Sequence, residues 1–232
     1  MQTLTGFFDH IDHNWMIKFL EYNIKVPNII GLIKKYLKAG IMDKGQYVAT
    51  EEGSAQGNII SPVLANIYMH FVLVLWYKEI IEKRAEGENF LVVYADDFIA
   101  GFQYQREAEA YYEALKNRMS KFGLELESSK SKIIKFGKFA EQNRKALGQG
   151  KPETFDFLGL TFYCSKTRKG KPCIKVKTSK KKFKQKVKAM KLWLYENRDI
   201  KVKDLMEKLS IKLIGHYHYH GISYNSKMLA NS

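Results

Sequence analysis

Two adjacent carboxylates, Asp96 and Asp97, stand between two apolar runs, and this pattern constrains the fold more than any other feature of the chain. The runs, residues 90–93 and 98–102, are rich in β-branched and aromatic side chains, which predicts two strands. The acidic pair then lies at or near the turn of a hairpin. Two carboxylates about 4 Å apart at a surface repel by about 4 kcal/mol at an effective dielectric of about 20. We therefore expect a neutralising cation, for which oxygen ligands favour Mg²⁺; a plain Asp-rich turn is the alternative.

The composition is that of a globular protein. The chain has 232 residues, of which 45% are hydrophobic and 13% aromatic, enough for one or two domains with a sizeable core. No uninterrupted apolar run reaches the roughly 20 residues of a membrane helix, so we expect no membrane partner. The two cysteines, Cys164 and Cys173, give no disulfide framework. Their number fits a reducing cytoplasm, and a bridge between Cys164 and Cys173 is the alternative. For the location of the chain we expect a prokaryotic cytoplasm.

The positive charge is concentrated at the C-terminal end. The net charge is +15, yet residues 1–159 carry 20 Lys and Arg against 20 Asp and Glu. Residues 160–232 carry 19 Lys and Arg against 4 Asp and Glu, and so hold the whole surplus. Such asymmetry indicates a polyanionic partner, of which nucleic acid is the first choice, and a solvated basic face is the alternative.

Hydrophobic periodicity predicts an α+β fold. Helices are expected over residues 13–22, 28–39, 61–84, 105–122 and 202–214, with a further helix from Ser179 onward. The helix over 61–84 should begin with Ser61 as its N-cap and Pro62 at its first position. Strand-like segments are residues 46–50, 90–93, 98–102, 124–126, 133–136, 155–162 and 174–177. These segments predict helices packed on an antiparallel sheet, followed by a basic helical region.

Five motifs in a fixed order identify a family. They are Gly-Phe-Phe-Asp-His-Ile-Asp-His (6–13), Gln-Gly-Asn-Ile-Ile-Ser-Pro-Val-Leu-Ala-Asn-Ile-Tyr (56–68), Tyr-Ala-Asp-Asp (94–97), Lys130 after Gly-Leu-Glu-Leu (123–126), and Phe-Asp-Phe-Leu-Gly (155–159). Together they resemble a group II intron-encoded reverse transcriptase/maturase. A single motif would carry little weight, but the order and the spacing agree over nearly all of residues 3–230.

The resemblance implies the palm of a right-hand polymerase over residues 1–162 and a basic thumb, or maturase region, over residues 163–232. The implied reaction is RNA-directed DNA synthesis by two Mg²⁺ ions about 3.5–4 Å apart. Asp96 would be a principal metal ligand, with Asp97 beside it as a ligand or an outer group. Lys130 corresponds to the basic residue near the leaving pyrophosphate, where negative charge develops.

Further residues acquire roles through the same resemblance. Phe8 matches the aromatic residue under the sugar of the incoming nucleotide, although a core aromatic is the alternative. Gln56 and Gly57 match the loop near the nucleotide and the templating base. Nucleic acid would contact the primer-gripping segment and the thumb through Phe157, Leu158, Gly159, Lys180, Lys181, Lys182, Lys184, Lys188, His216 and Tyr217. Because His216, His218 and His220 alternate, a metal site is an alternative there, but the family pattern favours packing and RNA contact.

The chain also departs from the family. The first catalytic aspartate of the family falls on Thr3, and Asp9 lies six residues further along. Ala55 stands where proline is usual, and Asn58 where a second glycine is usual. The fingers region that precedes these motifs in the family is not found before them here. We therefore predict little or no polymerase activity from this chain by itself.

Three functional readings follow. The first is a polymerase in intron mobility, acting on an RNA template, a DNA primer and deoxynucleoside triphosphates. The second is a maturase remnant that binds intron RNA without polymerising, and the third is a fragment with no independent role. A homodimer remains open on the sequence alone. Salt-dependent RNA binding and Asp96-dependent primer extension distinguish the three.

Overall fold

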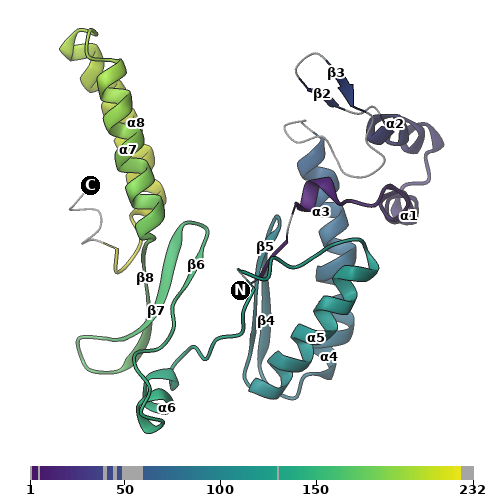
Figure 1. The fold of residues 1–232 in the computed structure, drawn as a ribbon, viewed down its shortest axis with the longest axis horizontal. Coiled ribbons are helices and arrows are strands. Elements are labelled where there is room, and N and C mark those ends of the chain that lie inside the picture. The colour runs from purple at the N-terminus through teal and green to yellow at the C-terminus, as the bar shows by residue number, and fades with distance from the viewer. Residues whose placement is uncertain are drawn as a thin grey trace. The chain divides into compact units, whose positions relative to one another are not determined.

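The computed structural model describes residues 2–4, 6–38, 41–43, 46–48, 60–129 and 131–225 (Figure 1). The chain forms two compact units, Met1–Ile133 and Ile134–Ser232, and both combine helices with antiparallel strands. The predicted α+β class is therefore confirmed. The predicted boundary between palm and thumb, at 162/163, lies inside the second unit, so the functional division stays a prediction.

The first unit is built on a three-stranded antiparallel sheet in the order β1-β5-β4, beside a separate hairpin of β2 and β3. In the described residues, one long helix and three shorter α-helices belong to the same unit. The bounds are β1 (Gln2–Thr3), η1 (Phe7–Asp9), α1 (His13–Asn23), α2 (Pro27–Lys38), β2 (Ile41–Asp43), β3 (Gln46–Val48), α3 (Ser61–Met69), η2 (His70–Val74), η3 (Tyr77–Ile81), α4 (Glu82–Arg84), β4 (Asn89–Tyr94), β5 (Asp97–Phe102) and α5 (Gln105–Lys121).

The helices cover one face of this sheet. Strand β4 alternates between half-buried and exposed residues, as period-two strands with one solvated face do. The covered face carries the fully buried Phe98, together with Leu91 and Phe102, which pack on the core. The Phe102 ring lies 5.0 Å from that of Tyr111 on α5. The opposite face keeps Phe90 and Tyr94 exposed, so the sheet has one core side and one open side.

The long helix over residues 61–84 contains two π-helical segments, η2 and η3. Such segments change the usual i→i−4 ladder, so carbonyl groups turn toward other donors. Arg118 on α5 donates from Nε to the Val72 carbonyl at 3.0 Å and from a terminal guanidinium nitrogen to the Phe71 carbonyl at 3.2 Å. Its guanidinium also lies over the Phe122 ring, at 4.5 Å. Arg118 thereby ties α5 to the irregular part of the core helix.

The predicted N-cap of this helix is wrong. Ile60 occupies that position with helical backbone angles, so the helix begins one residue earlier than expected. Ser61 is buried, and its hydroxyl lies 3.2 Å from the Tyr36 hydroxyl. Among the described residues, one helix, Ser61–Arg84, is long and apolar enough to cross a membrane. This is weak evidence for a membrane span, because core helices of soluble proteins meet the same criteria.

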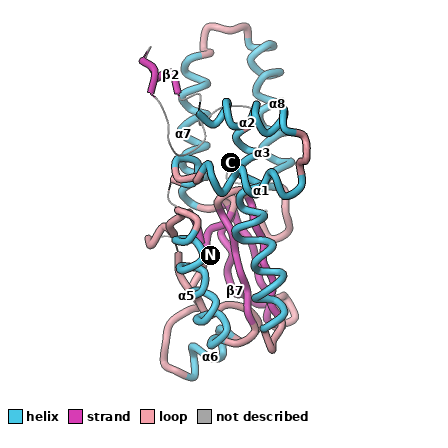
Figure 2. Tube along the Cα trace, turned by 90° about the vertical axis from the view of Figure 1, so that its right-hand side faces the viewer, coloured by secondary structure: helices cyan, strands magenta, loops and turns pink. Residues whose placement is uncertain are grey.

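The second unit joins a three-stranded antiparallel sheet, in the order β6-β7-β8, to a helical hairpin. Helices α7 and α8 run side by side in both views (Figures 1 and 2). The bounds are α6 (Ala140–Ala146), β6 (Phe155–Phe157), β7 (Leu160–Lys166), β8 (Pro172–Thr178), α7 (Lys180–Glu196) and α8 (Val202–His220). Ser179 caps α7, because its side chain accepts a hydrogen bond from the Lys182 N–H. Helix α8 extends six residues beyond the predicted end at residue 214.

Three predicted strands differ from the structure. Residues 124–126 contribute only an isolated bridge, between Leu4 and Leu126. Residues 133–136 form no strand, since an alternating pattern still requires a partner strand to form a ladder. Residues 155–162 divide into β6 and β7 at a turn. Cys164 and Cys173 are free and occupy opposite faces of the β7–β8 ladder, because their register partners are Ile174 and Ser165.

Candidate active site

The acidic pair occupies the predicted hairpin. Tyr94 of β4 pairs with Asp97 of β5, which leaves Ala95 and Asp96 as the two-residue turn. Ala95 has a φ of 52°, in the left-handed region that costs a residue with a Cβ atom about 1–2 kcal/mol. Such strain persists only where the surrounding structure imposes it, and it recurs at functional sites. The turn thus holds Asp96 at the tip and Asp97 at the start of the central strand.

Asp97 belongs to the open face of the sheet. Its cross-strand neighbour Tyr94 is 63% exposed, and Phe90 and Val92 on the same face are also exposed. The Phe90 ring lies over Gly101, where an added Cβ would come within 2.2 Å of it. Gly101 therefore lets an aromatic ring lie flat on the sheet. Among the described residues, the carboxylates thus adjoin a partly apolar sheet face on which Phe90, Val92 and Tyr94 are exposed.

Strand β1 brings position 3 to the acidic pair. Thr3 pairs with Asp97 in the antiparallel register, and the Leu4 N–H donates to the Asp96 carbonyl at 3.4 Å. Cα atoms of such pairs lie about 4.5–5.5 Å apart, and paired positions share one face of a sheet. A residue at position 3 is therefore an immediate neighbour of Asp97. In this chain that residue is threonine rather than a carboxylate.

Of the four other residues predicted for this site, the structure describes Phe8. Phe8 lies in the short helix η1, is half-buried and packs against the hydrophobic core, with its ring 5.5 Å from that of Phe7. This packing agrees with the alternative that Phe8 is a core aromatic residue. A role of Phe8 at the sugar of the incoming nucleotide stays a prediction. Gln56, Gly57 and Lys130 lie outside the described residues.

The side chains at the hairpin of Asp96 and Asp97 supply only some of the ligands that a hard divalent cation needs. Within the described residues, no group of three or more His, Cys, Asp or Glu side chains is arranged to hold a metal ion. Asp96 and Asp97 still offer two carboxylates at one hairpin. Mg²⁺ binds such sites through one or two carboxylates together with substrate phosphates and water. An Mg²⁺ ion at this pair would need further oxygens, which a phosphate-bearing substrate and water would have to supply.

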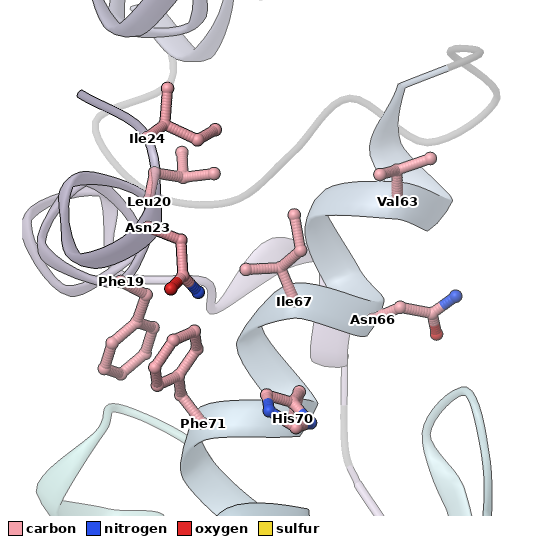
Figure 3. A pocket seen from close by; sticks show the side chains of 9 residues that line it. All are labelled: Phe19, Leu20, Asn23, Ile24, Val63, Asn66, Ile67, His70 and Phe71. Carbon is pink, nitrogen blue, oxygen red and sulfur yellow. The ribbon is translucent and has the colours of Figure 1, made fainter. Parts of the chain in front are cut away.

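A groove of about 370 Å³ lies between α1 and the long helix (Figure 3). The Phe19 and Phe71 rings stack beside it at 4.7 Å. Of the described residues predicted to bind the nucleotide or the metal, neither Phe8 nor Asp96 or Asp97 is among its lining residues. Its lining residues are Phe19, Leu20, Asn23, Ile24, Val63, Asn66, Ile67, His70 and Phe71.

In the second unit, the predicted nucleic-acid segment forms a tight turn. Phe157 pairs with Leu160, so Leu158 and Gly159 are the two loop residues, with φ values of 50° and 76°. Two left-handed residues in succession are typical of a type I′ hairpin turn. Phe157 is buried, whereas Leu158 and Gly159 are half-buried. The turn therefore presents the backbone of residues 158–159 at the surface.

The predicted basic contacts lie on the helical hairpin. The five lysines of α7 that were predicted to contact nucleic acid are exposed, Tyr217 on α8 is exposed, and His216 is half-buried. These lysines project from the N-terminal half of α7, where the helix dipole adds to their positive field. They are Lys180, Lys181, Lys182, Lys184 and Lys188.

Two of the three alternating histidines of α8, His216 and His220, pack against neighbouring side chains, and the three do not form a three-histidine metal site. His216 Nδ1 and His220 Nε2 lie 3.4 Å and 2.8 Å from the Lys186 Nζ atom, while His220 Nδ1 lies 3.3 Å from Thr178 Oγ1. Burial, assisted by the charge of Lys186, lowers the pKa of His220 to about 4, and the same causes lower the pKa of His216. Because a lysine ammonium can only donate, the two ring nitrogens that face Lys186 Nζ accept its hydrogen bonds. His218 is exposed.

Two residues that were not predicted, Tyr219 and Asn225, connect the Leu158–Gly159 turn, the end of β8 and the end of α8. Tyr219 donates its hydroxyl to the Leu158 carbonyl at 2.8 Å. Asn225 donates to Thr178 Oγ1 and to the His220 carbonyl, both at 2.8 Å, and accepts from the Thr178 N–H. The spacing of His216 and His220, one helical turn apart, was the only sequence signal for this network.

Comparison with known proteins identifies the class. The chain belongs to the reverse transcriptase (RNA-dependent DNA polymerase) family, whose model matches residues 3–162. The match begins at Thr3 and includes the hairpin of Asp96 and Asp97. The family is defined by RNA-directed DNA polymerases, and it implies a polymerase palm, divalent metal ions, a nucleic-acid template and nucleotide substrates.

More specifically, the chain is related to proteins encoded by group II introns. It is 46% identical over 79 residues to the group II intron-encoded protein LtrA of Lactococcus lactis subsp. cremoris, covering 32% of this chain and 13% of that protein. It is 28% identical over 137 residues to the putative COX1/OXI3 intron 2 protein of Saccharomyces cerevisiae, covering 59% of this chain and 14% of that protein. The chain thus spans about one seventh of the length of these relatives.

Proposed function

We propose that the chain carries a group II intron-type polymerase centre in which Asp96 and Asp97 bind Mg²⁺ but the third carboxylate is replaced by Thr3. The single observation that supports this proposal most is the register between Thr3 and Asp97, which makes position 3 the neighbour of the acidic pair. With one carboxylate fewer, the site holds its metal ions more weakly. Polymerisation by this chain is accordingly weak or absent.

Each residue has a defined part in this proposal. When bound, the two metal ions activate the primer 3′-hydroxyl and stabilise the charge of the transferred phosphoryl group. Asp96, at the turn, and Asp97, at the strand end, hold these ions beside the open sheet face. Phe8 limits the space at the sugar of the incoming nucleotide, Gln56 and Gly57 border the nucleotide, and Lys130 neutralises the pyrophosphate as it leaves.

Nucleic acid lies, in this proposal, on the second unit. The exposed lysines of α7, the Leu158–Gly159 turn, and His216 and Tyr217 of α8 contact the phosphates and sugars of intron RNA or of an RNA–DNA hybrid. The charge of residues 160–232, 19 Lys and Arg against 4 Asp and Glu, favours this assignment. The same charge also favours a second function, in which the chain acts as a maturase that binds intron RNA without polymerising.

Primer extension tests the polymerase proposal. The substrate is an RNA template with an annealed DNA primer, supplied with deoxynucleoside triphosphates and Mg²⁺. We expect little synthesis by the native chain, a gain in Thr3→Asp, and loss of that gain when Asp96→Asn is added. Robust synthesis by the native chain that depends on Asp96 would refute the claim of an incomplete centre.

Salt-dependent RNA binding tests the second function. Each phosphate neutralised on a single strand adds about −0.7 to the slope of log K against log salt concentration. Replacing Lys180, Lys181 and Lys184 with glutamine should flatten that slope by up to about 2. Intron RNA binding that is insensitive to salt would count against both functions of the second unit.

A further inference from the structure

The turn between β6 and β7 adopts a backbone conformation that its own sequence disfavours. Leu158 and Gly159 both have positive φ values, 50° and 76°. Hairpin turns of this kind favour Asn-Gly, because asparagine and glycine tolerate the left-handed region, whereas the Cβ of leucine crowds the following carbonyl. Contacts from outside the turn must therefore maintain this conformation.

Two contacts reach the turn from the two helices. Tyr219, near the end of α8, donates its hydroxyl to the Leu158 carbonyl at 2.8 Å. Ser179, the N-cap of α7, donates its N–H to the Gly159 carbonyl at 2.9 Å. Both carbonyls of the turn are thus held by residues far away in the sequence. Of the two donors, the Tyr219 hydroxyl belongs to a side chain, so it can be removed without changing the backbone.

The donor hydroxyl is itself well placed. The next residue, His220, is 1% exposed and is fixed by Thr178 Oγ1 and by Lys186 Nζ. Asn225 secures the same helix end by donating to the His220 carbonyl. The end of α8 is thereby anchored to the end of β8. The ring of Tyr219 remains 54% exposed, so its burial contributes little to the core.

We propose that Tyr219 is a positioning residue, whose hydroxyl holds the Leu158–Gly159 turn in the conformation that contacts nucleic acid. This inference rests on the proposed function, which places the turn in the nucleic-acid surface. Tyr219 acts on binding through the turn and needs no contact with the nucleic acid. Without its hydroxyl, the competent conformation is less populated, and the apparent affinity falls in proportion.

The first test compares Tyr219→Phe with Tyr195→Phe, which removes a hydroxyl from an exposed tyrosine of α7. Affinity is measured by fluorescence anisotropy with a fluorescein-labelled RNA–DNA hybrid. One net hydrogen bond corresponds to about fivefold in an equilibrium constant, so we expect Tyr219→Phe to weaken binding by about fivefold. In ¹⁵N-labelled protein, the Gly159 amide signal should also move. Tyr195→Phe should change neither the affinity nor this signal.

The second test is a rescue that a merely structural role would not give. Leu158→Asn creates an Asn-Gly turn that favours the same conformation by itself. In the Leu158→Asn background, adding Tyr219→Phe should weaken binding by less than twofold. If Tyr219 contacted the nucleic acid directly, its loss would weaken binding equally in both backgrounds, which would overturn the inference.

Gly159→Ala separates this inference from the proposed function. Alanine is strained at a φ of 76°, so the variant should distort the turn and weaken binding more than Tyr219→Phe does. If Gly159→Ala weakens binding and Tyr219→Phe does not, the positioning role is wrong and the proposed interface stands. If Gly159→Ala binds the hybrid like the native chain, the turn lies outside the interface and both proposals for it fail.

Discussion

Acidification should destabilise the second unit through His220. This imidazole is buried, and its pKa is lowered from 6.5 to about 4. Above pH 6.5, the histidine is neutral in the folded and the unfolded chain, so the free energy of unfolding does not depend on it. Between about pH 6.5 and about pH 4, the unfolded chain binds a proton at this site and the folded chain does not. Stability is therefore lost over this range as the pH falls.

The structure sets the size of this loss. Each pKa unit is worth 1.36 kcal/mol, so the difference between 6.5 and about 4 amounts to about 3 kcal/mol. At mid-range, the slope approaches 1.36 kcal/mol per pH unit. The main physical cause is the burial of the His220 imidazole, and the ammonium of Lys186, 2.8 Å from His220 Nε2, acts in the same direction. His216 contributes in the same direction, because its pKa is also lowered.

Denaturant titrations of protein labelled with 5-fluorotryptophan can follow the second unit by itself. Trp193 lies on α7, whereas Trp15 and Trp76 belong to the first unit, so their ¹⁹F signals report on different units. We compare the native chain with His220→Asn, and use His218→Asn, at an exposed site on the same helix, as the matched control. The pH dependence of Trp193 unfolding should flatten in His220→Asn and persist in His218→Asn. An identical pH dependence in the native chain and His220→Asn would refute this account of the cluster.

Three further outcomes are expected. Arg118→Leu should lower the free energy of unfolding by about 2–3 kcal/mol, because the Phe71 and Val72 carbonyls lose a charged donor. Urea denaturation measures this change, and Arg106→Leu, at an exposed site, is the control. Ala95→Gly should stabilise the first unit by up to about 1 kcal/mol, since glycine tolerates the left-handed turn, and an unchanged melting temperature would contradict it. Leu64→Ala, at a fully buried site, should cost about 2–5 kcal/mol by the same denaturation assay.

The sequence sufficed where local patterns determine structure. The β4–β5 hairpin was predicted correctly because both flanks strongly favour strands and the acidic pair lies between the predicted strands. The helices α1, α2 and α5 were placed to within one or two residues by their apolar spacing. The chain's membership of the reverse transcriptase family followed from five ordered motifs rather than from any single residue.

Features that depend on distant contacts were not predicted. The turn at Leu158–Gly159 interrupts residues 155–162, whose alternating pattern predicted a single strand. This turn is held by Tyr219, 61 residues away. The π-helical segments of the core helix have no local signal, and two carbonyls of η2 accept hydrogen bonds from Arg118 on another helix. The pairing of Thr3 with Asp97 joins positions 94 residues apart in the sequence. Only the resemblance suggested that position 3 belonged to the site.

Mn²⁺ binding measured by electron paramagnetic resonance tests most directly whether the acidic hairpin is a metal centre that lacks one carboxylate. The chains compared are the native protein, Thr3→Asp, Thr3→Asp with Asp97→Asn, and Asn117→Asp, which adds one carboxylate at an exposed position on α5. The account predicts that Thr3→Asp binds Mn²⁺ at least about tenfold more tightly than the native chain, as expected for one added charged ligand. It also predicts that Asp97→Asn removes the gain and that Asn117→Asp gives none. Equal Mn²⁺ affinity in the native chain and Thr3→Asp would contradict the account.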